Sequence, residues 1–122
     1  MARILIVDDE FANRLLVRTI LEHAGHEIVE AADASEGLRF ARESIPDLAI
    51  VDLSLPGASG VEFITMLRRD PKTRAMTIAL YTGSDVDASM RDFMAVAGIT
   101  HVIPKPCEPP ALLRLVEAAL TN

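Results

Sequence analysis

Three acidic residues directly follow a short apolar segment near the start of the chain. The sequence ILIVDDE places Asp8, Asp9 and Glu10 in succession. Neighbouring carboxylates repel one another and cost stability unless a positive charge lies between them. Asp52 ends a second apolar segment, LAIVD, so a divalent cation between Asp52 and Asp8 or Asp9 would replace repulsion with coordination. Ligands that are all carboxylate oxygens favour Mg²⁺, which keeps several waters and completes its shell with phosphate oxygens.

Asp52 is also the candidate nucleophile of this group. A carboxylate can attack a phosphoryl group and form an acyl phosphate. The transferred group carries negative charge on three equatorial oxygens. Mg²⁺ would neutralise one of these oxygens, Lys105 a second, and the Thr82 hydroxyl can bond the third. Gly83, directly after Thr82, would let the backbone approach the phosphoryl group without an intervening side chain.

Strands and helices are predicted to alternate along the chain and to position these residues. Short apolar or β-branched segments indicate strands at 3–7, 27–31, 48–52, 77–82 and 101–103. Apolar residues at helical spacing, with capping residues, glycines and prolines at the ends, predict the intervening helices. These helices are expected from Phe11 to Ala24, from Asp33 to about Ser44, from Ser59 to before Pro71, from a Ser84 or Asp85 cap to Ala97, and from Pro109 to Leu120.

This alternation is typical of a parallel α/β sheet with helices on both faces and right-handed crossovers. Ligands of such sheets bind at the carboxyl ends of the strands. The reactive side chains stand at those ends: the acids after the first and third strands, Thr82 at the end of the fourth, and Lys105 after the fifth. We therefore expect one site at this edge of the sheet.

The length and charge of the chain exclude several classes of function. The 122 residues are enough for a single domain, residues 1–122. A formal net charge of −6 argues against nucleic-acid binding by this chain alone and against binding to anionic membranes. The single cysteine, Cys107, rules out a disulfide framework, and no apolar segment is long enough to span a membrane. We expect a cytoplasmic protein.

In this arrangement the chain resembles the response regulator receiver domain of two-component signalling. The resemblance covers nearly the whole chain and depends on DD at 8–9, Asp52 in DLSLPGASG, TG at 82–83 and KP at 105–106. It implies a flavodoxin-like, doubly wound (βα)5 fold with five parallel strands in the order 2-1-3-4-5. It also implies that Asp52 is phosphorylated by a histidine kinase or a histidine phosphotransfer protein. Such a domain is a monomer or weak dimer and catalyses only its own phosphorylation and dephosphorylation.

The resemblance also assigns roles within the site. Mg²⁺ would be held by Asp9, Asp52 and the backbone carbonyl of Ser54, with Asp8 acting partly through water. Lys105 would pair with the phosphoryl group, and the peptide bond after Lys105 is expected to be cis.

One position departs from the family pattern. Three residues before the lysine the family usually has Tyr or Phe, and this chain has Val102. A β-branched valine has no large group that can move between exposed and buried positions. We therefore expect phosphorylation to change the conformation of one face of the domain, which extends from the fourth strand and the helix after it to the last helix. Thr82 would transmit this change, and Val102, at the switch position, would be a passive packing residue.

Other functions of similar folds fit the sequence less well. A flavodoxin-like cofactor site or a dinucleotide site would need a glycine- or hydroxyl-rich phosphate loop, and DDE after the first strand repels phosphate. A phosphatase with an aspartyl nucleophile needs a general acid nearby, and Ser54 cannot supply one. The remaining alternative is a degenerate receiver that docks a partner without phosphorylation. Such a receiver would be expected to lack an acid or the lysine, and this chain has the acids, the threonine and the lysine.

Overall fold

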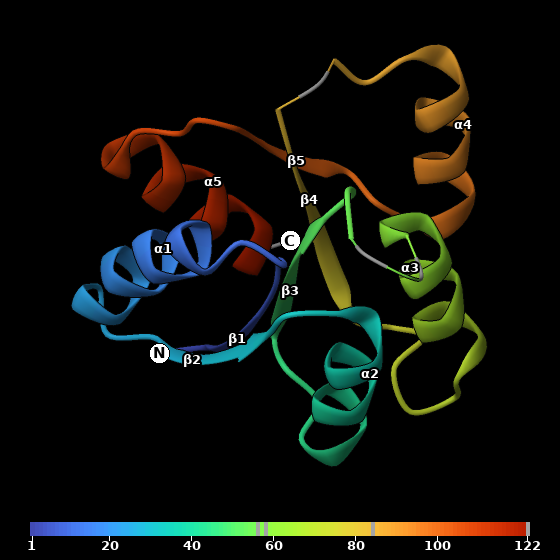
Figure 1. Cartoon of the computed structure of the whole chain (residues 1–122), viewed down its shortest axis with the longest axis horizontal. Coiled ribbons are helices and arrows are strands. Elements are labelled where there is room, and N and C mark those ends of the chain that lie inside the picture. The colour runs from blue at the N-terminus through green and yellow to red at the C-terminus, as the bar shows by residue number, and fades with distance from the viewer. Residues whose placement is uncertain (56, 58, 84, 122) are drawn as a thin grey trace.

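The computed structural model of the chain describes residues 1–55, 57, 59–83 and 85–121, in which strands and helices alternate (Figure 1). The strands are β1 (Arg3–Val7), β2 (Glu27–Ala31), β3 (Leu48–Asp52), β4 (Thr77–Thr82) and β5 (His101–Pro104). The helices are α1 (Phe11–His23), α2 (Ala34–Glu43), α3 (Gly60–Arg69), α4 (Ala88–Ala97) and α5 (Pro109–Leu120). Within these described ranges, every helix is too short or too polar to cross a membrane.

The strands form one parallel sheet in the order β2-β1-β3-β4-β5, which confirms the predicted doubly wound order. The central position of β3 explains why all of its residues are buried. Successive side chains of a strand point to opposite faces. Ile4 and Ile6 therefore belong to the core under α1 and α5, whereas Leu5 and Val7 belong to the core under α2, α3 and α4. Figure 1 shows these two groups of helices on opposite sides of the sheet.

The helix starts follow local capping chemistry, with one correction. Asp33 caps α2, and Ser59 forms a reciprocal capping box with Glu62 at the start of α3, as predicted. Helix α4 begins later than predicted, because the side chain of Asp87, not that of Asp85, accepts the Met90 N–H. The other predicted cap, Ser84, lies outside the described residues.

Helix α1 is present as predicted, but the side that it buries was not evident from the apolar spacing. Val17 and Leu21 face the core, while Phe11, Leu15 and Leu16 are 65%, 48% and 49% exposed. The apolar residues of α1 thus lie on two sides of the helix, and packing against the sheet and α5 selects the side with Val17 and Leu21.

Candidate functional site

The sheet register brings the predicted reactive residues to one edge. Val7 of β1 pairs with Val51 of β3, so Asp8 and Asp52 follow at neighbouring strand ends. Thr82 of β4 pairs with Pro104 of β5, and the Lys105 N–H donates to the Thr82 carbonyl at 2.9 Å. The carboxyl ends of the four strands β1, β3, β4 and β5 therefore meet around one site.

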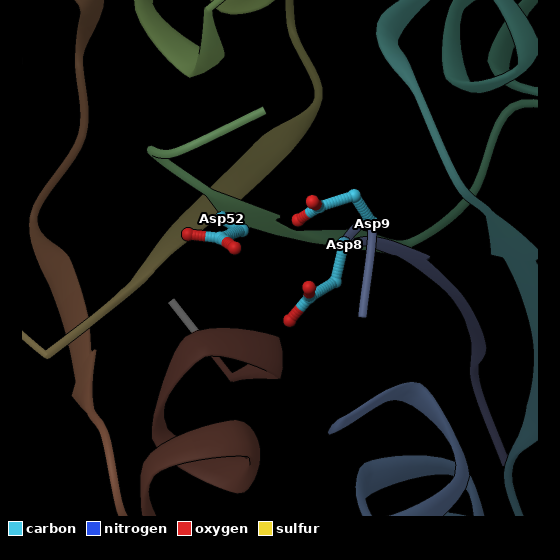
Figure 2. A group of neighbouring side chains, drawn as sticks. All are labelled: Asp8, Asp9 and Asp52. Atoms are coloured by element: carbon cyan, nitrogen blue, oxygen red, sulfur yellow. The ribbon is translucent and has the colours of Figure 1, made fainter. Parts of the chain in front are cut away.

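Three carboxylates gather at this edge, as Figure 2 shows. One oxygen from each of Asp8, Asp9 and Asp52 lies within 4.8 Å of the others. Asp8 is 0% exposed and Asp52 is 6% exposed, whereas Asp9 is exposed to solvent. Two of the acids are thus removed from water, and burial of a charge is costly unless it is paired.

Lys105 supplies the positive charge that the buried acids require. Its Nζ lies 3.2 Å from Asp8 Oδ2 and 3.1 Å from Asp52 Oδ2. Burial is the largest single influence and lowers the pKa of Lys105, but the bonds to Asp52 and Asp8 together outweigh it, so the pKa is raised above its usual value. Lys105 is therefore charged at neutral pH. The bond between Lys105 and Pro106 is cis, as the resemblance implied.

Backbone N–H groups fix the remaining oxygens of the buried acids. Asp8 Oδ1 accepts the Glu10 N–H at 2.9 Å, and Asp52 Oδ1 accepts the Ser54 N–H at 3.0 Å. Each buried carboxylate thus receives one backbone donor and one lysine donor. The Ser54 N–H group thus contacts Asp52, whereas the role predicted for the Ser54 carbonyl, as a ligand of Mg²⁺, stays a prediction.

Two residues that support the acid cluster were missed by the sequence analysis. Arg14 Nη1 donates to the Asp8 carbonyl at 2.7 Å, and its Nε bonds Glu30 Oε1 of β2 at 3.0 Å. Gly60, at the start of α3, packs directly on the end of β3: a Cβ there would lie 2.7 Å from the Asp52 carbonyl oxygen. Two features of the sequence could have indicated them. Arg14 is close to the acids along the chain, and Gly60 stands at the start of a capped helix.

Thr82 and Gly83 lie beside Lys105, on the β4 side of the site. Thr82 is buried, and a pocket of about 160 Å³ opens next to it. The pocket lies between the segments that follow β3 and β4, and its lining residues are Leu53, Ser54, Thr82, Asp85, Val86, Asp87 and Met90. A Cβ at Gly83 would meet only ordinary contacts at 3.6 Å from Lys105, so packing does not require glycine at this position.

Val102 lies apart from the acid cluster. It is partly buried in β5 opposite Leu80 and packs against the core shared with α4.

The acid cluster fits a hard divalent cation. Its candidate ligands are carboxylate and carbonyl oxygens, which suit Mg²⁺ better than they suit softer metals. Three carboxylates face one ammonium, so negative charge remains at the exposed side where Asp9 stands. The donor atoms and the remaining negative charge are therefore compatible with a magnesium ion.

Comparison with known proteins identifies the family. The sequence model of the family described as the response regulator receiver domain matches residues 4–117. Protein PilH of Pseudomonas aeruginosa is 30% identical over 122 residues, which cover 100% of both chains. The phosphate regulon transcriptional regulatory protein PhoB of Escherichia coli is 34% identical over 118 residues, 97% of this chain and 51% of PhoB. The chain thus spans about half the length of PhoB.

Solved structures agree with this match. The chemotaxis protein CheY4 of Vibrio cholerae superposes with a TM-score of 0.91 at 30% identity, over 98% of this chain and 99% of CheY4. A CheY-like receiver domain protein from Methanospirillum hungatei gives a TM-score of 0.89 at 32% identity, over 99% of this chain and 94% of the other. With its fold, its family match and these relatives in agreement, the chain belongs to the response regulator receiver domain family of two-component signalling.

Proposed function

We propose that residues 1–122 form a single receiver domain that accepts a phosphoryl group on Asp52. One observation supports this proposal most directly: the Lys105 ammonium lies 3.1 Å from Asp52, within a cluster of three carboxylates at the sheet edge. The arrangement holds a nucleophile beside a fixed cation and beside a group of oxygens suited to Mg²⁺.

In the transfer step, one Asp52 oxygen attacks the phosphorus atom of a phosphohistidine on the donor. The new P–O bond forms as the P–N bond breaks, and the electron pair of the P–N bond passes to the imidazole. Lys105, released from its bond to Asp52, pairs with one phosphoryl oxygen, and the Thr82 hydroxyl donates to another. Asp9, Asp52 and the Ser54 carbonyl would hold Mg²⁺, with Asp8 acting partly through water. When bound, Mg²⁺ supplies positive charge that offsets the negative charge on the phosphoryl oxygens.

The response to phosphorylation runs through Thr82 to α4 in this proposal. The pocket beside Thr82 gives the segment before α4 room to move toward Asp52. Helix α4 buries none of its residues completely, so shifting it disrupts little packing. Val102 stays in its packed position, and the face from β4 and α4 to α5 carries the change.

A nuclear magnetic resonance experiment tests this route. Beryllofluoride mimics the phosphoryl group, and its addition with Mg²⁺ should shift the resonances of residues 83–98. We expect Thr82→Ala to reduce this response and Val102→Ala to leave most of it. Equal suppression by the two variants would contradict a passive role for Val102.

The proposed partner is a histidine kinase or a histidine phosphotransfer protein in the cytoplasm. The chain alone is expected to act as a monomer or weak dimer. It is also expected to bind neither nucleic acid nor membranes, because its net charge is −6. Its chemistry is limited to its own phosphorylation and dephosphorylation. A degenerate receiver that only docks a partner is the alternative, and the joint presence of Asp52, Lys105 and Thr82 disfavours it.

The decisive experiment is intact-protein mass spectrometry after incubation with acetyl phosphate and Mg²⁺. We expect the wild type to gain the mass of one phosphoryl group, and chelation of the metal to prevent this gain. Asp52→Asn keeps the side-chain shape and should remain unmodified. Asp92→Asn, at an exposed site on α4, removes the same charge and should be modified like the wild type. Phosphorylation of Asp52→Asn at the wild-type rate would overturn the assignment.

A further inference from the structure

The buried ring of Tyr81 contacts the ammonium of Lys105. Its ring centroid lies 4.6 Å from the Lys105 Nζ, within the range of a cation–π contact. Tyr81 is 3% exposed and is the register partner of Asp52 on the neighbouring strand. Among the residues that the structure describes, the ammonium therefore contacts the carboxylates of Asp8 and Asp52 and one aromatic face.

The contacts of Lys105 with these partners are expected to change differently when Asp52 is phosphorylated. Under the proposed function, Asp52 becomes phosphorylated, and Asp8 and Asp52 take part in holding Mg²⁺. Both ion pairs of Lys105 are then weakened or rearranged. The Tyr81 ring belongs to the packed core between the sheet and α1 and α5, and it binds neither metal nor phosphate. The aromatic contact is the one that can persist through the reaction.

We propose that Tyr81 is a positioning residue that holds the Lys105 ammonium over Asp52 while the carboxylates are engaged elsewhere. This inference rests on the proposed phosphoacceptor function and adds a residue to it. An aromatic ring suits the task because its face attracts a cation without carrying a net charge. A fourth acid at this position would instead compete for Mg²⁺ and repel the phosphoryl group.

The surroundings of Tyr81 favour its neutral form. Burial raises the pKa of its hydroxyl, and this effect exceeds the lowering by the Lys105 charge. A tyrosine side chain, with its usual pKa of about 10, is neutral at physiological pH and adds no negative charge to the cluster.

The test compares Tyr81→Leu, which removes the ring, with Tyr81→Phe, which keeps it. The assay is the affinity for beryllofluoride in saturating Mg²⁺. Tyr81→Leu should weaken binding about three- to tenfold, because the ring is the partner that still holds the ammonium once Mg²⁺ has engaged its two carboxylates. Tyr81→Phe should restore the affinity. Ile4→Ala is the control for lost core packing, because Ile4 lies in the same core at the far end of the sheet and should not change the affinity.

A double-mutant cycle separates positioning from a merely structural effect. In a Lys105→Ala background, Tyr81→Leu should have no further effect, because there is no ammonium left to position. An equal loss in the presence and absence of Lys105, or wild-type affinity in Tyr81→Leu, would overturn the inference. Tyr81→Phe behaving like Tyr81→Leu would overturn it as well.

Resonances of the wild-type protein give a readout that does not depend on any variant folding. Resonances of protons above an aromatic face are shifted upfield. The resonances of the Lys105 side-chain methylene protons should therefore be shifted upfield, and this shift should remain after Mg²⁺ is added. Loss of the upfield shift with Mg²⁺ would refute the inference. Failure of the proposed function is distinguishable, because it would appear as no phosphorylation of the wild type by acetyl phosphate, whatever the state of the Tyr81 contact.

Discussion

Replacing Asp9 with asparagine should have opposite effects on the stability of the metal-free protein and on Mg²⁺ binding. Among the described residues, Lys105 pairs with Asp8 and Asp52 but not with Asp9. Asp9 thus faces two carboxylates and one ammonium, whose combined charge is negative like that of Asp9 itself. Asparagine keeps the shape of the side chain and removes its charge, so the repulsion is relieved while the backbone and packing are retained.

The geometry sets the size of the effect. Carboxylate oxygens of the three acids lie within 4.8 Å of one another. At that separation two unit charges repel by about 0.9 kcal/mol in a water-like dielectric and by about 3.5 kcal/mol at an effective dielectric constant near 20. Asp9 is exposed, so the lower figure applies, and we expect Asp9→Asn to stabilise the metal-free fold by about 1 kcal/mol. For 122 residues this corresponds to a rise in melting temperature of about 4 °C.

The same substitution removes a proposed ligand of Mg²⁺. We expect the affinity to fall roughly tenfold or more, since loss of even an outer-shell partner of a metal ligand has an effect of that size. Ligand binding stabilises a protein according to its concentration relative to the dissociation constant. The melting temperature of the wild type should therefore rise more steeply with Mg²⁺ than that of the variant, and the initial gap should close.

Thermal unfolding monitored by circular dichroism across a Mg²⁺ titration measures both effects. Asp92→Asn on α4 is the matched control, because it changes the net charge equally at an exposed site away from the cluster. Its stability should stay within about 0.5 kcal/mol of the wild type, and its Mg²⁺ dependence should be unchanged. An Asp9→Asn variant that melts at or below the wild-type temperature without metal, or that binds Mg²⁺ equally well, would refute the reasoning.

Two further substitutions test the neighbouring contacts. Gly60→Ala should lower the free energy of unfolding in urea by about 1–3 kcal/mol, because its Cβ would meet backbone atoms of the β3 end at 2.7 Å. Gly83→Ala, with only ordinary contacts, should not, and equal losses would contradict this explanation. Tyr81 is the single tyrosine, so absorbance titration should show its pKa above the usual value of about 10. Because the unfolded chain then ionises first, stability should fall as pH rises above that value. Lys105→Ala should raise the pKa of Tyr81 further, and a fall would be inconsistent with the contact.

The sequence alone predicted the order of the strands and helices, although not the start of α4, and it indicated which residues could react. Continuous apolar segments ending in Asp8 and Asp52 indicate buried strands with acids at their carboxyl ends, because a strand covered on both faces has little room for polar side chains. The capping box from Ser59 to Glu62 is equally local: a side chain and a backbone N–H group three residues apart form it without help from the rest of the fold. The strand order, in contrast, came from the family resemblance, since local periodicity does not say which strands are neighbours.

The tertiary structure decided which side chains meet. Val7 pairs with Val51 only in the folded sheet, and this register brings Asp8 and Asp52 within reach of the same lysine. The buried side of α1 and the ring of Tyr81 beneath Lys105 were likewise set by packing between elements distant in the sequence. The physical reason is that hydrophobic burial and charge pairing depend on what lies across from a residue, whereas periodicity and capping depend only on its neighbours along the chain.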